Sequence, residues 1–246
     1  MSGAWRTICL AAAVLAGLSL TACRSTQDKA REVRAENAQV LAAAQQGIVV
    51  SKTNKDVKVL GTSLLHDQYG DAIVVEVKNE SNKTLVNMPI LIDLRDAKGK
   101  SVYSNDLPGL DTPLTHISLL RPGETFDWVN DQISPNGTPK TAKVKVGPAE
   151  GNAPANLPEI AVGPSKLENN PSGILAHGEV TNKSQIDQAK LVLYAVARSG
   201  GEVVGAGRGQ LKNLKAGAKA GTYNIFFIGD PRSGDVTVTA PPSVLQ

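Results

Sequence analysis

The thiol of Cys23 is the side chain whose position most clearly suggests a chemical modification. It follows an apolar run at 8–20 and the small residues Thr21-Ala22, and a polar segment at 24–28 comes directly after it. A cysteine in this position has little apolar core in which to be buried. The run is shorter than the roughly 20 apolar residues of a membrane-spanning helix, and it has the organisation of an export signal that is removed by cleavage.

The tetrapeptide Leu20-Thr21-Ala22-Cys23 resembles the lipobox of bacterial lipoproteins. The resemblance implies a signal peptide at 1–22, a diacylglyceryl group on the Cys23 sulfur and, often, an acyl chain on the new amino terminus. Two or more chains give stable anchoring, because each buried methylene contributes about 0.8 kcal/mol. We therefore expect an extracytoplasmic bacterial protein anchored to membrane lipid through Cys23. Cys9 would leave with the signal, so no disulfide would remain.

The segment after Cys23 has the composition of a helix. Residues 25–46 are rich in Ala, Gln, Glu and Arg, contain neither Gly nor Pro, and place Val33, Val40 and Leu41 at roughly helical intervals. This pattern predicts a lipid-anchored helical stalk at 23–47 that spaces the rest of the chain from the membrane.

From about Asp56 onward, short runs rich in β-forming residues alternate with turn residues, which predicts strands. Residues 57–79 align without a gap on residues 160–182, so that Asn79 falls on Asn182, and Ser81 falls on Ser184 just beyond. The chain therefore carries two copies of one β domain, at 55–148 and 158–246, joined by a linker at 148–158. We predict an all-β fold of two tandem immunoglobulin-like β-sandwiches.

Three motifs of the first copy resemble the FxLYD domains of bacterial surface and envelope proteins. They are Glu-Val-x-Asn-x-Ser at 76–81, Asp-Leu-Arg-Asp-Ala-Lys-Gly-Lys at 93–100 and Leu-Leu-Arg-Pro-Gly-Glu at 119–124. The family's Leu-Tyr-Asp-like triplet is Leu-Arg-Asp at 94–96 here, and the second copy departs further, with Val-Ala-Arg at 196–198. The resemblance implies the sandwich fold and an envelope setting, and the family has no assigned reaction.

The residues that could carry catalysis do not form a recognisable motif. His66, His116 and His177 are the only histidines, and His66 does not align with His177 between the copies. No hydrolase or zinc signature occurs, so we expect no catalytic residue, no cofactor and no metal site. The run Gly-Ala-Gly-Arg-Gly at 205–209 lacks the spacing of a dinucleotide-binding loop and is interpreted as a flexible connection between strands.

Two pairs of carboxylates also stand close together in the sequence. Asp93 and Asp96 flank an arginine, and Asp127 and Asp131 flank Trp128. Neither pair has the Asp-x-Asp-x-Asp-Gly spacing of a calcium loop. We interpret all four aspartates as solvated carboxylates of turns.

The charge of the chain argues against one class of partner. The 26 Lys and Arg residues against 23 Asp and Glu residues give a net charge of +3 without a basic stripe, so nucleic acid is not an expected partner. Lys140, Lys143 and Lys145 fall along one face of a predicted strand. The first interpretation is that these lysines keep an edge strand from pairing with a neighbouring strand. The second is that they attract anionic lipid or wall polymer.

Together these patterns favour a non-catalytic lipoprotein of the cell envelope that serves as a protein-interaction or structural module. Its expected partner is an envelope protein or a wall polymer. The alternative is a protein that binds a wall glycan or small ligand in the cleft between the two domains, with Trp128 and Tyr103 as candidate sugar-stacking aromatics. An enzyme would need perturbed acids gathered in one pocket, and this is the least favoured reading.

Overall fold

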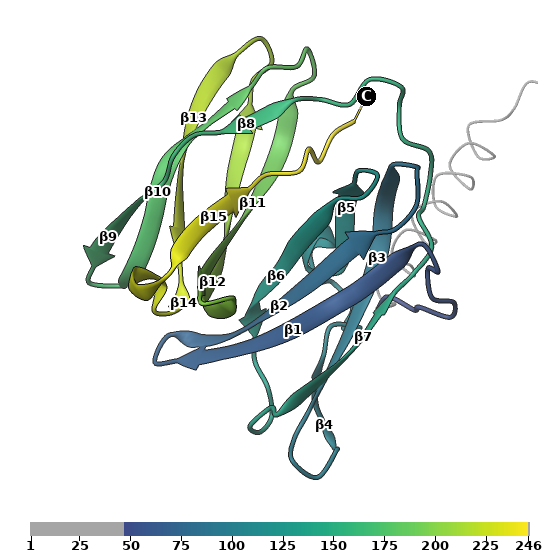
Figure 1. Ribbon diagram of the computed structural model, residues 1–246, viewed down its shortest axis with the longest axis vertical. Helices are drawn as coiled ribbons and strands as arrows, with labels where there is room; N and C mark the ends of the chain where they lie inside the picture. Colours follow the sequence, from purple (N-terminus) through teal and green to yellow (C-terminus); the bar gives the residue numbers. More distant parts are fainter. Residues whose placement is uncertain (1–46, 246) are drawn as a thin grey trace, which may run out of the picture. The chain divides into compact units, whose positions relative to one another are not determined.

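The computed structural model describes residues 47–245, and this part of the chain is built from antiparallel β-strands (Figure 1). Two short 3-10 turns, η1 (Thr112–Leu114) and η2 (Pro231–Ser233), interrupt the strands. The predicted all-β class is confirmed. Cys23, the predicted signal peptide and the predicted stalk lie outside the described residues.

The first copy contains two antiparallel sheets. One has the order β1-β2-β6, made of β1 (Val57–Asp67), β2 (Gly70–Asn79) and β6 (Thr125–Ile133). The other is organised around β3 (Leu85–Arg95), which pairs with β4 (Ser101–Ser104), β5 (His116–Leu120) and β7 (Thr141–Val146).

The second copy repeats this plan after an irregular segment that separates β7 from β8. Its first sheet consists of β8 (Ile160–Val162), β9 (Lys166–Asn170), β10 (Gly173–Asn182) and β13 (Lys219–Phe226). Its second sheet has the order β14-β12-β11-β15, made of β14 (Ile228–Gly229), β12 (Glu202–Leu214), β11 (Gln188–Ser199) and β15 (Asp235–Thr239).

The repeat found in the sequence is also a repeat in strand register. Val59 pairs with Val77 in the first copy, and Val162 pairs with Val180 in the second, at the positions that the gapless alignment equates. The difference lies at the edge of the sheet, where the continuous β1 corresponds to two short strands, β8 and β9.

A buried asparagine joins the two sheets of the first copy. Asn79 ends β2 and is 0% exposed. Its Nδ2 donates to the carbonyl oxygens of Lys83 at 2.7 Å and Leu120 at 3.2 Å, and Leu120 belongs to the opposite sheet. Its Oδ1 accepts from the backbone amide of Ser81 at 2.9 Å and from the Ser81 hydroxyl at 2.8 Å. One side chain therefore satisfies backbone groups of a turn and of both sheets.

The same arrangement recurs in the second copy. Asn182, also 0% exposed, donates to the carbonyl oxygens of Ile186 at 2.8 Å and Leu214 at 3.4 Å. It accepts from the amide of Ser184 at 3.1 Å and from its hydroxyl at 2.7 Å. The shared Asn-x-Ser of the sequence is thus a structural connection between sheets.

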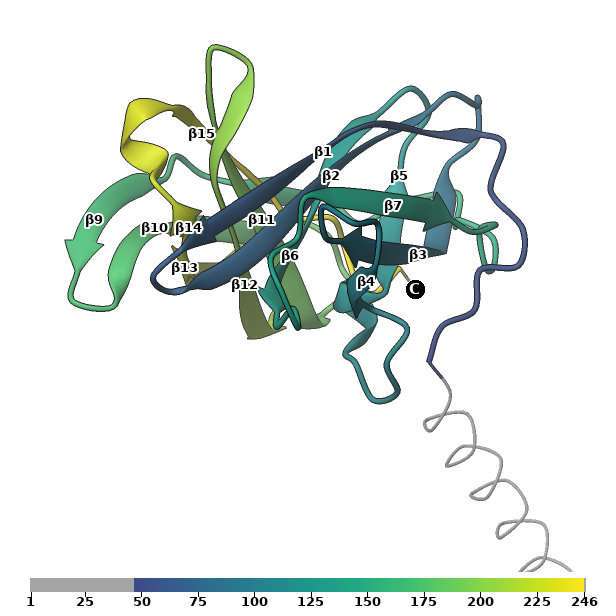
Figure 2. The ribbon, with the colours of Figure 1, turned by 90° about the horizontal axis from the view of Figure 1, so that it is seen from below.

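The apolar core does not stop at the boundary between the copies. On β11, Leu191, Leu193 and Ala195 pack inside the second copy, whereas Val192 and Tyr194 belong to the buried cluster that fills the first copy. Successive residues of a strand point to opposite faces, so β11 is covered on both sides. Figures 1 and 2 show β11 and β12 beside β2 and β6.

The glycine-rich run at 205–209 lies inside β12, so its interpretation as a flexible connection was wrong. A Cβ on Gly207 would lie 2.0 Å from the carbonyl oxygen of Phe226, and one on Gly209 would lie 2.8 Å from Cγ1 of Ile225. These glycines allow β12 to approach β13 closely. The alternation of the strand then places Arg208 on the opposite face, towards the first copy.

We expect Asn79→Ala and Asn182→Ala each to lower the free energy of unfolding by about 2–3 kcal/mol, because each leaves buried carbonyl and amide groups without partners. The measurement is urea unfolding followed by circular dichroism. The matched control is Asn82→Ala, since Asn82 is exposed and should change stability by less than about 0.5 kcal/mol. Equal effects of all three substitutions would contradict the role assigned to the buried pair.

Candidate functional site

The candidate site lies where the outer face of the β1-β2-β6 sheet meets the outer face of β11 and β12. Acidic groups come from the first copy and basic groups from the second. Nη2 of Arg198 lies 2.6 Å from Oδ1 of Asp127 and 3.5 Å from Oε2 of Glu76. The rings of Phe126 and Tyr194 meet edge to face, with centroids 5.1 Å apart. Charge complementarity and an aromatic contact therefore join the two copies.

Arg208 and Asp131 form the most buried charged pair of this interface. Their side chains are 2% and 16% exposed, with Nε of Arg208 3.5 Å from Oδ1 of Asp131. The backbone amide of Arg208 donates to Oδ2 of Asp131 at 2.8 Å. Burial raises the pKa of Asp131 even though Arg208 lowers it in part. Burial of this pair therefore costs desolvation energy, and the surrounding fold keeps the two side chains next to each other.

The interpretation of Asp127 and Asp131 as turn carboxylates was wrong. Both lie in β6, four residues apart, and so share the face that meets the second copy. Burial also raises the pKa of Asp127, partly offset by Arg198. The interpretation was also wrong for Asp93, which lies in β3 and is bonded by Arg95 at 2.6 Å, whereas Asp96 does accept backbone amides of a turn.

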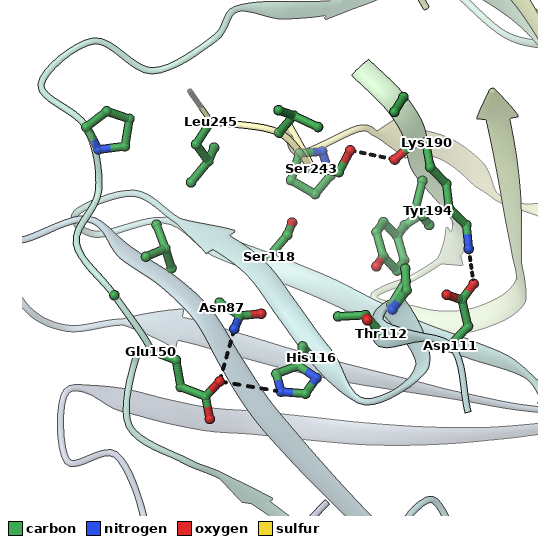
Figure 3. A pocket seen from close by; sticks show the side chains of 18 of the residues that line it. Asn87, Asp111, Thr112, His116, Ser118, Glu150, Lys190, Tyr194, Ser243 and Leu245 are labelled. Atoms are coloured by element: carbon green, nitrogen blue, oxygen red, sulfur yellow. Dashed lines mark hydrogen bonds and ion pairs between the residues drawn. The ribbon is translucent and has the colours of Figure 1, made fainter. Parts of the chain in front are cut away.

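A cleft of about 570 Å³ opens at one end of this interface (Figure 3). Both copies, the linker and the carboxyl-terminal segment contribute to its walls. The apolar part of the lining consists of Val86, Pro113, Pro154, Ala189, Val192, Tyr194, Pro241, Val244 and Leu245.

The charged groups of the cleft already have partners. Lys190 pairs with Asp111, which also accepts from Nε2 of Gln210 at 3.2 Å. Partial burial raises the pKa of Asp111, but hydrogen bonds from Lys190 and Gln210 outweigh this effect and leave it below the ordinary value. At the other end, Oε2 of Glu150 accepts from Nδ2 of Asn87 at 3.0 Å. A ligand therefore meets the compensated Lys190–Asp111 pair and the negative charge of Glu150, which Asn87 bonds without neutralising.

His116 stands beside Glu150 in the cleft, with Nε2 4.0 Å from Oε2 of the carboxylate. Burial lowers the pKa of His116, and the negative charge of Glu150 offsets only part of this effect. The imidazole is therefore neutral at pH 7 and offers one donor and one acceptor nitrogen. The approach between the two groups is visible in Figure 3.

One buried glutamine holds the carboxyl-terminal wall of the cleft. Gln188 is 0% exposed, and its Oε1 accepts from the amides of Ser243 at 2.9 Å and Val244 at 3.0 Å. Its Nε2 donates to the carbonyl oxygen of Val244 at 2.9 Å. The Ser243 hydroxyl also donates to the carbonyl oxygen of Lys190 at 2.5 Å. These bonds place Leu245 at the cleft.

The remaining histidines and the aromatic candidates lie elsewhere. His66 bonds Asp71 at 2.9 Å, and His177 lies 3.8 Å from a carboxylate oxygen of Glu168. Within residues 47–245, no group of three or more His, Cys, Asp or Glu side chains is placed to hold a metal ion. Trp128 is 0% exposed and donates to the carbonyl oxygen of Pro113, so its selection as a sugar-stacking residue was wrong.

Sequence reasoning missed Tyr194, Arg198 and Arg208. A signal was available, because β11 reads as a nearly continuous apolar run, which is typical of a strand covered on both faces. The charges that flank such a run predict an interface, but not which acidic residues meet them.

Neither a scan against protein-family models nor a search of curated proteins finds a match for this chain. The resemblances to the lipobox and to FxLYD domains therefore stay predictions. In residues 47–245, no helix is both long enough and apolar enough to cross a membrane.

We expect Asp131→Asn to lower the free energy of unfolding by about 3–5 kcal/mol, because it leaves the buried Arg208 without a counter-charge. The double variant Asp131→Asn/Arg208→Met should recover most of this loss, since the asparagine oxygen still accepts from the backbone amide. Thermal and urea unfolding measure both effects. The control is Asp230→Asn in an exposed pair with Arg232, which should change little. A double variant no more stable than the single one would contradict this assignment.

Proposed function

We propose that this chain is a non-catalytic lipoprotein of the bacterial cell envelope, anchored to membrane lipid through Cys23, and that its two β copies act together as a protein-interaction or structural module. The observation that carries the proposal is the charged interface between the two copies. Asp127 and Asp131, whose pKa values burial raises, each face an arginine of the other copy. Carboxylates with raised pKa are often general acids of active sites, and we assign these two instead to the contact that holds the two copies together.

The way the copies are joined also supports a module that works as one body. The described residues 47–245 belong to one compact unit, and the buried cluster of the first copy includes side chains of β11 and β12. Such a unit presents loops, sheet edges and faces in a fixed arrangement, which is what a partner protein or a structural role requires.

The anchor is tested by substitution of the modified thiol. Cys23→Ala should abolish incorporation of labelled fatty acid and move the protein from the detergent-requiring membrane fraction to the soluble extracytoplasmic fraction, because the acyl chains supply the binding energy. Cys9→Ala is the matched control and should leave labelling and fractionation unchanged. Membrane retention of the Cys23→Ala protein that still requires detergent would overturn the proposed anchor.

The cleft supports a second candidate function, the binding of a small uncharged ligand with an apolar body. Its volume of about 570 Å³ falls within the range of roughly 300–1,000 Å³ typical of ligand sites. Its one lysine is already paired with Asp111, so an anionic ligand would have to break that pair and would also meet the negative charge of Glu150, which only the neutral amide of Asn87 contacts. A glycan is less well supported, because Tyr194, the aromatic residue of the lining, is only 3% exposed.

This candidate is tested with N-phenyl-1-naphthylamine, a neutral fluorescent probe. We expect saturable binding that Ser118→Phe weakens at least about tenfold, because Ser118 lines the cleft and a ring there would overfill it. The control is Ser104→Phe, a partly buried serine of β4 outside the cleft lining, which should leave binding unchanged. Equal weakening by both variants, or no saturable binding, would rule out the cleft as an apolar-ligand site.

A further inference from the structure

The lysines of β7 lie on the outer face of the first copy's second sheet. Ala142, Val144 and Val146 are partly or fully buried, whereas Lys143 and Lys145 are exposed. Lys143 pairs in register with Asp93 and Lys145 with Leu91, which places both lysines on the face that looks away from the core.

The turn between β3 and β4 extends this positive surface. Lys98 and Lys100 are exposed there, and exposed Lys140 donates its backbone amide to the carbonyl oxygen of Arg95 at 2.7 Å, just before β7. We call the set Lys98, Lys100, Lys140, Lys143 and Lys145 the basic face.

Both acidic side chains within the basic face already have hydrogen-bond partners. Oδ2 of Asp93 is bonded by Arg95, and Oδ1 of Asp96 accepts the backbone amides of Lys98 at 2.8 Å and Lys100 at 2.9 Å. The five lysines and Arg95 against these two aspartates leave a net charge of +4 (6 − 2). The lysine ammonium groups are therefore free to meet an anionic surface.

The chain that leads towards Cys23 enters beside this surface. The backbone amide of Asn54 donates to the carbonyl oxygen of Val146, the last residue of β7, at 2.8 Å. Val50 is buried next to Gly147, and the exposed Lys52 and Lys55 lie on either side of Asn54 along the same segment.

The connection to the proposed anchor is short. Residues 24–46 separate Cys23 from the first described residue, and 23 residues span at most about 80 Å in any conformation. Such a tether keeps the basic face at a high local concentration next to the lipid, so individually weak contacts suffice.

We propose that the basic face docks on the anionic phospholipid headgroups of the leaflet that carries the anchor. The orientation of the protein in this proposal rests on the proposed lipid anchor, whereas the positive charge of the basic face does not depend on that anchor. Each lysine near an anionic leaflet contributes roughly a fivefold gain in binding, and a lipid chain combined with a basic patch is a stable two-signal attachment. The second copy packs on the opposite sheet of the first copy and so faces away from the membrane.

The test uses the mature chain with Cys23→Ser, which carries no lipid, so its outcome does not depend on the anchor. Binding is measured by sedimentation with vesicles of phosphatidylglycerol and phosphatidylcholine, and with vesicles of phosphatidylcholine alone. We expect binding only to the anionic vesicles and its loss at roughly 1 M salt, where the screening length falls to about 3 Å. The triple variant Lys98→Gln/Lys143→Gln/Lys145→Gln should weaken binding about a hundredfold.

The matched control removes the same charge from the second copy, as Lys166→Gln/Lys212→Gln/Lys219→Gln, three exposed lysines. It should change binding by less than about twofold, because these lysines lie beyond the screening length from the leaflet. Equal weakening by the two triple variants, absence of binding to anionic vesicles, or equal binding to neutral vesicles would overturn the proposal. Binding of soluble polyphosphate through the same lysines without vesicle binding would also overturn it, because the face would then recognise a phosphate polymer.

Discussion

The relation between the two copies depends on a guanidinium group that has almost no access to water. Arg208 is 2% exposed, and Asp131 of the other copy supplies its counter-charge and bonds its backbone amide. A charge buried in this way is tolerated only if its partner stays in place, so movement of one copy past the other would be strongly unfavourable. The shape of the cleft follows from this constraint, because its walls come from both copies.

The two copies share a fold, but their outer faces have diverged. By strand register, Asp127 and Asp131 of β6 correspond to Thr222 and Phe226 of β13. Both of these residues are exposed, and neither can pair with an arginine. The equivalent face of the second copy therefore lacks the acids that a further copy would need in order to stack in the same way. The contact between the two copies is heterologous, because it joins two different faces. Since the second copy lacks the acidic face, a third copy could not stack on it in the same way.

Most of the fold could be predicted from the sequence because its determinants are local. Alternating apolar residues and turn residues predicted the strands, and the gapless repeat predicted two copies of one β domain, whose equated residues pair in the same register in the structure. The interface could not be predicted in this way. Asp127 and Arg198 are 71 residues apart in the chain, and no short motif links an acidic position on one strand to a basic position so distant. The glycines of β12 were misread because tight packing against β13 and flexibility select the same residue.

The two sheets of the first copy differ in what covers their outer faces, and this difference distinguishes the two sides of the molecule. Its β1-β2-β6 sheet is covered by the second copy, while the sheet around β3 keeps a free outer face that carries Lys143 and Lys145. The segment leading towards Cys23 joins the latter side through Asn54 and Val146. With the proposed anchor, the first copy then acts as the base and the second copy is presented outward. Partner recognition in this orientation would fall to the exposed loops and the free sheet of the second copy, since the outer faces of the first copy are used for membrane attachment and for contact with the second copy.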